Sequence, residues 1–180
     1  MRAIATPIEG VLLLEPRVFG DERGYFYESF NERLFRELSG CALPFVQDNH
    51  SRSGRGVLRG LHYQQPPKAQ GKLVRVVAGS VWDVAVDIRP HSPTFGRWFG
   101  EVLSAANKRQ MWVAPGLAHG FLTLSDDTEF LYKTTDYWSP SHERCIAWND
   151  ADLGVLWPLE GAPLLSPKDE HGASFASLAR

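Results

Sequence analysis

Short stretches in which apolar and polar residues alternate place the strongest limit on what this chain can fold into. The clearest is VWDVAVDIR at residues 81–89, and residues 72–77 and 129–138 alternate in the same way. A period of two is typical of β-strands, because successive side chains point to opposite faces. Turn-forming clusters such as RPHSP at residues 89–93 separate these stretches and favour antiparallel connections.

Helical periodicity is limited to two short stretches. Residues 31–38 run from Asn31, which can cap a helix, toward Gly40, which can end one, and a second short helix is expected at residues 173–178. Many short strands with few helices indicate an all-β protein. We therefore predict an antiparallel β-sandwich or jelly-roll barrel with a few short peripheral helices, whose inward face can line a pocket.

Composition bounds the domain organisation and excludes one class of partner. No linker, repeat or low-complexity segment divides the 180 residues, and 43% of them are hydrophobic. We therefore expect one domain over residues 1–180, with a sizeable core that needs no disulfide or metal. Acidic and basic residues are mixed along the whole chain, for a formal charge of −2, which argues against a nucleic-acid-binding surface.

Cysteine usage and the N-terminal residues bear on location. Cys41 and Cys145 are far apart and outside any CxxC spacing, as expected of ordinary thiols in a reducing compartment. The apolar run at residues 11–14 ends at Glu15 and Pro16, so it is too short for a signal sequence or a membrane span. We expect a cytoplasmic protein with no membrane partner.

The segment QDNHSRSGRGVLRGLHYQQPPKAQGK, residues 47–72, carries an unusual variety of polar side chains on strand-like sequence. Alternation sends His62 and Gln64 to the face opposite Leu61. Gly60 shares the face of His62, where a missing side chain leaves room for a ligand to approach the backbone. A lone histidine on such a face is more often a core residue, but His62 has many polar neighbours, which favours a pocket.

A second histidine follows a Pro-Gly turn in APGLAHGF, residues 114–121, and this spacing resembles the second motif of the cupin superfamily. Cupins often hold a metal, for which their first motif supplies two histidines and a glutamate. Here His62 is followed by Gln64 where the second histidine would stand and by Lys72 where the acid would stand. An ammonium repels a divalent cation, and two histidines leave a zinc or iron site short of ligands. We therefore predict a cupin barrel without a metal.

A closer resemblance rests on an ordered series of motifs spread over most of the chain. They are RGYFYE at 23–28, QDN at 47–49, RGLHYQ at 59–64, QGKL at 70–73, SPTFG at 92–96, HGF at 119–121, YK at 132–133 and LSPKD at 165–169. From about residue 16 to residue 169 the chain resembles the dTDP-4-dehydrorhamnose 3,5-epimerases. The resemblance implies a homodimeric isomerase with no metal or organic cofactor. Its expected reaction inverts C3 and C5 of the substrate dTDP-4-dehydro-6-deoxy-D-glucose.

The residues supply the groups that such a reaction requires. Epimerisation beside a ketone needs a base, a donor that stabilises the enolate oxygen, and an acid on the opposite face. His62 is the natural base, and the resemblance gives Asp169 the role of orienting it and Lys72 that of stabilising the enolate. Tyr132, expected on a strand face shared with Trp138, is the predicted acid. Taken singly, Tyr132 could be a core aromatic, Lys72 a solvated strand end and Asp169 a turn residue.

Binding residues are predicted from their chemistry and from the resemblance. Guanidinium and ammonium groups suit the diphosphate, and amides suit the sugar or base; the candidates are Arg23, Arg59 and Lys168, with Gln47 and Asn49. The resemblance adds Glu28, Asp48, His119 and Glu143. For Arg23, Glu28 and Glu143 the alternative is a surface salt bridge. Trp138 stands where the family commonly has a tyrosine stacked on thymine, and its larger ring should preserve stacking.

Three other functions remain possible from the sequence. They are a metal-dependent cupin, a non-catalytic module that binds sugar nucleotides, and an epimerase of the same fold that acts at C3 only or C5 only. We also expect the homodimer to form through N-terminal strands that join the partner's barrel, because residues 11–14 and 25–30 are rich in apolar and aromatic side chains.

Overall fold

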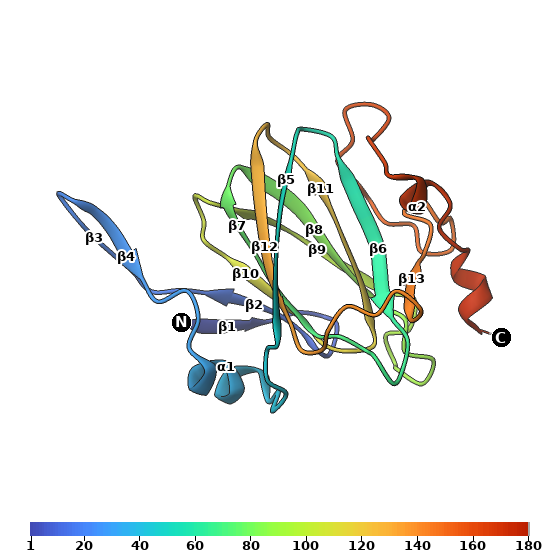
Figure 1. Ribbon diagram of the computed structural model, residues 1–180, viewed down its shortest axis with the longest axis horizontal. Helices are drawn as coiled ribbons and strands as arrows, with labels where there is room; N and C mark the ends of the chain where they lie inside the picture. The colour runs from blue at the N-terminus through green and yellow to red at the C-terminus, as the bar shows by residue number, and fades with distance from the viewer. Residues whose placement is uncertain (180) are drawn as a thin grey trace.

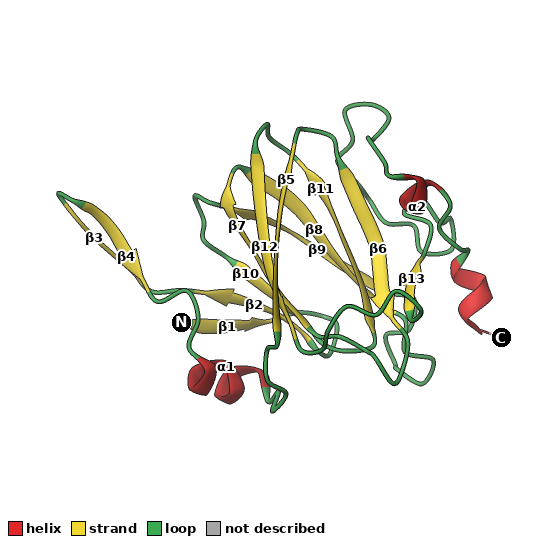
Figure 2. Ribbon diagram, in the orientation of Figure 1, coloured by secondary structure: helices red, strands yellow, loops and turns green. Residues whose placement is uncertain are grey.

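Two antiparallel β-sheets face each other in the computed structural model, which describes residues 1–179 (Figure 1 and Figure 2). The first sheet has the spatial order β1 (Arg2–Ala5), β2 (Val11–Glu15), β10 (Gln110–Val113), β7 (Lys72–Ala78), β12 (Thr128–Thr134) and β5 (Gln47–Ser53). The second has the order β13 (Glu143–Cys145), β6 (Leu58–Gln64), β11 (Leu117–Thr123), β8 (Ser80–Asp87) and β9 (Trp98–Ser104). All strand pairings in both sheets are antiparallel, which confirms the predicted fold class.

Strand β8 shows how alternation builds the interior. Val81 and Ala85 point into the core between the two sheets, whereas Val84 points to the outer face of the second sheet. That outer face is covered by C-terminal residues, among them Phe175 of the 3₁₀ helix η1 (Phe175–Ala179). The C-terminal residues therefore cover the outer face of the second sheet, and its inward face meets the first sheet.

The helices begin and end close to where the sequence predicts. Helix α1 (Glu32–Ser39) starts after Asn31, whose Oδ1 accepts a hydrogen bond from the Leu34 N–H at 3.1 Å, and it ends at Gly40 in the left-handed conformation. The short C-terminal helix is present as η1. Helix α2 (Pro167–Glu170) was not predicted, because its single turn is too short to show a period. No helix among the described residues is long and apolar enough to cross a membrane.

The predicted strand at residues 129–138 is wrong at its C-terminal end, since β12 stops at Thr134. The Thr134 hydroxyl and the Gln70 amide both donate to the carbonyl of Asp136, at 2.8 and 2.7 Å, and these bonds turn the chain away from the sheet. Trp138 therefore lies on a loop and does not share a strand face with Tyr132.

The N-terminal strands divide into an integrated part and a projecting part. β2, which contains the apolar residues 11–14, pairs with β1 and β10 of its own sheet. Both edges of this strand are therefore occupied within the chain, and the expectation that it joins a partner's barrel stays a prediction. The hairpin of β3 (Val18–Asp21) and β4 (Gly24–Tyr27) instead projects from the barrel (Figure 1). Phe19, Tyr25 and Phe26 on this hairpin are each more than half exposed, Phe26 at 71%.

Candidate active site

A cavity of about 280 Å³ opens between the two sheets. Its lining contains seven residues that the sequence singles out, together with Gln70: Gln47, Asn49, His62, Gln70, Lys72, Tyr132, Trp138 and Glu143. The strands β5, β7 and β12 contribute from the first sheet, and β6 and β13 contribute from the second. Gln70 was missed although it opens the QGKL motif, because nothing in the sequence separates it from a turn residue.

His62 and Asp169 form the central polar pair of the cavity. The imidazole Nε2 lies 2.5 Å from Asp169 Oδ1, although the residues are 107 positions apart. Asp169, at the start of α2, also accepts the Gly60 N–H at 3.2 Å and the Ser166 hydroxyl at 2.7 Å. Burial alone would raise the pKa of Asp169, but these hydrogen bonds lower it to about 2.

The ionisation of His62 reflects opposing influences. Burial lowers its pKa and so does the nearby charge of Lys72, whereas the hydrogen bond to Asp169 raises it, and the lowering prevails. With Asp169 ionised, the proton of the neutral imidazole resides on Nε2, which leaves the lone pair on Nδ1. His62 is therefore a neutral base near neutral pH.

Gly60 has a different role from the one predicted. A Cβ atom there would lie 2.5 Å from the Gly120 Cα and 2.9 Å from the His119 carbonyl oxygen. The glycine thus permits close approach of β6 and β11, and its N–H reaches Asp169. It positions the partner of His62 and does not make room for a ligand.

Lys72 and Tyr132 face His62 from the first sheet. Lys72 is only 9% exposed, and its Nζ donates to the His62 carbonyl at 3.2 Å. Burial lowers the pKa of Lys72 to about 8, and burial followed by the charge of Glu143 raises the pKa of Tyr132. The ammonium is thus charged and the phenol protonated near neutral pH, as their predicted roles require.

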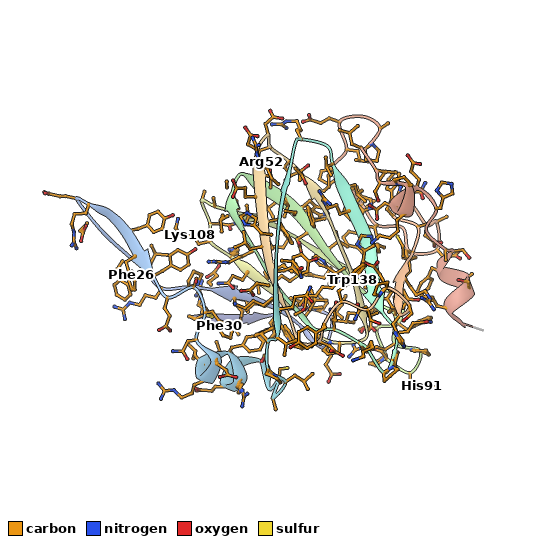
Figure 3. All side chains as sticks on the ribbon, viewed as in Figure 1. Phe26, Phe30, Arg52, His91, Lys108 and Trp138 are labelled. Carbon is orange, nitrogen blue, oxygen red and sulfur yellow. The ribbon has the colours of Figure 1, made fainter. Side chains whose placement is uncertain are left out.

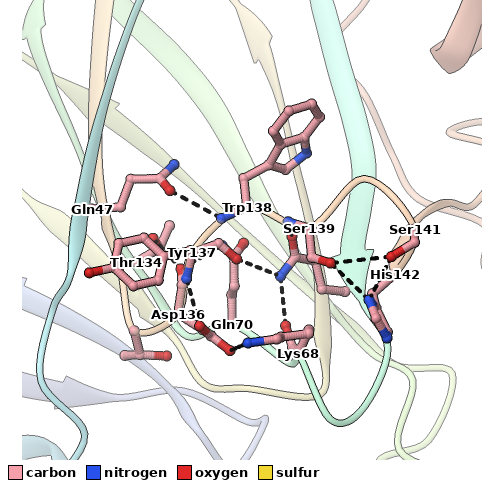
Figure 4. Close-up of polar contacts among 12 residues, drawn as sticks. Gln47, Lys68, Gln70, Thr134, Asp136, Tyr137, Trp138, Ser139, Ser141 and His142 are labelled. Atoms are coloured by element: carbon pink, nitrogen blue, oxygen red, sulfur yellow. Dashed lines mark hydrogen bonds and ion pairs between the residues drawn. The ribbon is translucent and has the colours of Figure 1, made fainter.

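Two amides of β5 line the cavity from the first sheet. Gln47 donates from Nε2 to Asn49 Oδ1 at 2.9 Å, and its Oε1 accepts the backbone N–H of Trp138 at 3.0 Å (Figure 4). The Trp138 side chain is 57% exposed although it lines the cavity. Its indole face is therefore available to a planar group.

Charged groups gather on the side of the cavity formed by β6 and β13. Lys168 donates to Glu143 at 2.9 Å, and despite its partial burial Glu143 has a lowered pKa because of that hydrogen bond and charge. Arg59 donates to the Ser53 hydroxyl at 3.1 and 3.3 Å, and its charge acts on Tyr132. These cations lie beside the predicted catalytic groups.

Two predicted binding residues point elsewhere. Asp48, between the two cavity-lining amides of β5, is exposed and forms an ion pair with Lys133 at 2.9 Å. His119 is buried, and its Nε2 lies 3.0 Å from both carboxylate oxygens of Asp83, a partner that the sequence did not reveal. The backbone register nevertheless sets His119 directly opposite His62.

Arg23 and Glu28 do not reach the cavity of their own chain. Arg23 lies in the turn between β3 and β4, where its side chain is 89% exposed and pairs with Asp21. Glu28 follows β4 and lies with Phe26 at the base of the hairpin. Figure 3 shows Phe26 on this projecting hairpin, well separated from Trp138 on the barrel.

One group of described residues could hold a metal ion. The ligand atoms of His62, Cys145 and Asp169 all lie within 4.8 Å of one another. Cys145 was not assigned a role from the sequence, and burial followed by the charge of Asp169 raises the pKa of its thiol to about 12. A metal would therefore have to displace a firmly held proton and enter between His62 and Asp169.

Comparisons with known proteins agree with this geometry. A family model described as dTDP-4-dehydrorhamnose 3,5-epimerase matches residues 5–177. A protein of that name from Pseudomonas aeruginosa is 64% identical over 176 residues, which cover 98% of this chain and 97% of that protein.

Two solved structures share the fold over nearly the whole chain. A dTDP-6-deoxy-D-glucose-3,5-epimerase from Legionella pneumophila, in complex with dTDP-4-keto-L-rhamnose, superposes with a TM-score of 0.94 at 51% identity, covering 98% of this chain and 96% of that one. A 3'-monoepimerase from Streptomyces bikiniensis, in complex with dTDP-quinovose, gives a TM-score of 0.91 at 38% identity, covering 98% and 88%. The chain belongs to the dTDP-4-dehydrorhamnose 3,5-epimerase family.

Proposed function

We propose that this protein inverts C3 and C5 of dTDP-4-dehydro-6-deoxy-D-glucose and so produces dTDP-4-dehydro-L-rhamnose. One observation carries the proposal: His62 and Tyr132 line the same cavity from opposite sheets, and the ammonium of Lys72 lies in that cavity. A base and an acid on opposite faces of a sugar ring are what inversion beside a ketone requires.

The proposed reaction begins with proton removal by His62. Its Nδ1 takes the hydrogen from the carbon beside the C4 ketone, and the carboxylate of Asp169 stabilises the imidazolium that forms. The electron pair of the broken C–H bond moves onto the ketone oxygen and gives an enolate. Lys72 stabilises this negative charge in a site with little water, where a point charge acts strongly.

Tyr132 completes the inversion in this proposal. Its phenol returns a proton to the same carbon from the opposite face. The phenolate then takes up a proton from solvent and the imidazolium of His62 releases one, so both groups are restored. The raised pKa keeps the donor protonated in the resting enzyme. The same three groups act at the second carbon, which also adjoins the ketone.

The nucleotide is proposed to lie across the mouth of the cavity. Trp138 stacks on the thymine, and Gln47 and Asn49 meet polar atoms of the base or sugar. Arg59 and Lys168 bind the diphosphate. Glu143, which lines the cavity, is proposed to contact the sugar. His119 and Asp48 are given no direct contact, because their side chains are engaged by Asp83 and Lys133.

We also propose a homodimer in which each projecting hairpin enters the partner's site. The uncovered aromatic surface of β3 and β4 supports this, because exposed apolar patches of this kind are usually covered by a partner. Arg23 and Glu28 would then reach a diphosphate and base that they cannot reach in their own chain. Two free thiols, Cys41 and Cys145, suit the proposed cytoplasmic location.

A single inversion is the second candidate, because a 3'-monoepimerase has the same fold at 38% identity. Incubation with substrate in D₂O distinguishes the two, since a double epimerase exchanges hydrogen at both C3 and C5. If deuterium enters at one carbon only and one centre is inverted, the protein is a single-site epimerase and the proposed double inversion is wrong. No exchange and no inversion would refute both.

The proposed chemistry needs no metal, because the predicted cupin ligand positions carry Gln64 and Lys72. We expect full activity after treatment with EDTA and no stoichiometric metal by elemental analysis. Tightly bound zinc, iron or manganese whose removal abolishes turnover would make the protein a metal-dependent cupin.

Two variants separate the base from the acid. Tyr132→Phe keeps the ring but removes the proton, so it should lose about 10²- to 10⁴-fold in epimerisation while exchange at the carbon served by His62 persists. His62→Ala should abolish both exchange and inversion. Epimerisation by Tyr132→Phe near the rate of the unmodified protein would assign the acid to another group.

A further inference from the structure

Gln64 is a buried polar residue to which the proposed reaction gives no role. It ends β6, two positions beyond His62, and is only 5% exposed. It also stands where a cupin metal site would have its second histidine. In this structure its amide is fully engaged with backbone groups, so it is not available as a ligand.

The three hydrogen bonds of Gln64 converge on two segments of chain. Its Nε2 donates to the carbonyl oxygens of Lys68, at 2.6 Å, and of Tyr137, at 3.3 Å. Its Oε1 accepts the backbone N–H of Ser139 at 2.7 Å. The last two partners flank Trp138, so one amide holds the backbone on both sides of the residue that lines the cavity mouth.

Other contacts leave this segment with few alternative anchors near Trp138. Gln47 holds the N–H of Trp138 itself, at 3.0 Å, and Gln70 holds the carbonyl of Asp136, at 2.7 Å (Figure 4). The segment from Thr135 to His142 belongs to no strand. The Thr134 hydroxyl and backbone hydrogen bonds hold the ends of this segment, at Thr135, Asp136 and His142. Side-chain amides hold its centre, and Gln64 supplies the anchors at the two residues beside Trp138.

We propose that Gln64 is a positioning residue for nucleotide recognition, which acts by fixing the loop that presents Trp138 to the base. This inference rests on the proposed function, since it needs a base to stack on Trp138. A side chain that bonds only to backbone can be replaced without touching the substrate. The loss should therefore appear in KM for the dTDP-sugar and in the dissociation constant for dTDP, with kcat little changed.

Two substitutions test the role. Gln64→Met keeps the length but removes all three hydrogen bonds, and we expect KM and the dTDP dissociation constant to rise about 10-fold with kcat within about 2-fold. Gln64→Glu keeps the acceptor for Ser139 but sets a carboxylate against two carbonyl oxygens. Protonation of the introduced carboxylate restores a donor. As the pH is lowered from about 8 to about 6, the KM of Gln64→Glu should therefore decrease toward that of the unmodified protein.

A double-variant cycle with Trp138→Ala distinguishes positioning from general stability. If Gln64 acts through the indole, Gln64→Met should raise KM less than about 2-fold in the Trp138→Ala background. The matched control is Lys68→Met, which removes the ion pair to Asp136 on the same loop but leaves the carbonyl that Gln64 holds. Its KM should be unchanged.

Several outcomes would overturn the inference. An equal rise in KM in both backgrounds, or an unchanged KM in Gln64→Met with a thermal melt well above the assay temperature, would show that Gln64 does not position Trp138. An unmodified protein that does not bind dTDP, as followed by its tryptophan fluorescence, would remove the nucleotide role and this inference with it. If the unmodified protein binds dTDP and Gln64→Met has an unchanged KM, this inference is refuted while the proposed function stands.

Discussion

The substitution Asp169→Asn isolates the charge of the carboxylate that holds His62. The Gly60 N–H points at Oδ1, so the amide oxygen of an asparagine will take that position and still accept from His62 Nε2. The amide nitrogen then faces the hydroxyl of Ser166, which can accept. The imidazole keeps its tautomer and orientation, and only the negative charge is lost.

The structure sets the order of magnitude of this loss. Burial raises the pKa of Asp169 and its hydrogen bonds lower it, and the net result is a pKa of about 2, which corresponds to a few kcal/mol of net stabilisation of the carboxylate. If a stabilisation of that order passed to the imidazolium, kcat/KM would fall on the order of 10- to 100-fold. Asp169→Ala, which also frees the imidazole to turn, should lose more. Ser166→Ala removes one donor but keeps the charge, and should lose less than about 5-fold.

The assay is exchange at C3 and C5 in D₂O together with kcat/KM over a range of pH. Asp169 raises the pKa of His62, so its neutralisation should move the acidic limb of the pH profile to lower pH. If kcat/KM of a folded Asp169→Asn falls by more than about 10⁴-fold, the tautomer of His62 has changed as well as the charge beside it. An unchanged rate would remove Asp169 from the mechanism.

Three further predictions concern the cavity and the hairpin. Activity should fall above about pH 8 as Lys72 loses its proton, and Lys72→Met should lose most activity at every pH. Lys72→Arg should be less active but keep its charge at high pH. If its activity still falls above about pH 8, that fall is due to another group. Added Zn²⁺ should inhibit reversibly through the His62, Cys145 and Asp169 group, and Cys145→Ser should weaken that inhibition; equal inhibition of both forms would exclude the thiol. Mixed subunits carrying Arg23→Ala and His62→Ala should recover activity that neither variant has alone, because one intact barrel receives one intact hairpin; no recovery on subunit exchange would argue against the shared site.

The sequence predicted strand positions and helix ends correctly where neighbouring residues determine them. Alternation located β8 and β7, and Asn31 and Gly40 located the ends of α1, because caps and strand faces depend on neighbouring residues. The end of β12 was misjudged because Gln70, more than sixty positions away, turns the chain at Asp136.

The candidate site divides in the same way. The residue types for a base, an acid and an enolate donor could be recognised from the motifs, and the cavity contains His62, Lys72 and Tyr132 together. Contacts between distant residues could not be predicted. Asp83 lies 36 positions from His119, and nothing in the sequence marks it as the partner of that histidine.

The arrangement of two facing sheets also explains how one base and one acid could serve two carbons. In a gluco-configured pyranose the hydrogens on C3 and C5 project from the same face of the ring, on either side of the C4 ketone. A histidine on β6 below that face can therefore reach both, and a tyrosine on β12 above the ring can return both protons. In the proposed mechanism Lys72 lies beside the ketone oxygen and would stabilise the same charge in either enolate. A single-site epimerase would need no different catalytic groups. We therefore propose that the number of inversions depends on how the intermediate is held between them. Trp138, as the proposed stacking partner of the base, and Gln64, which bonds to the backbone on both sides of Trp138, are then the residues expected to change it.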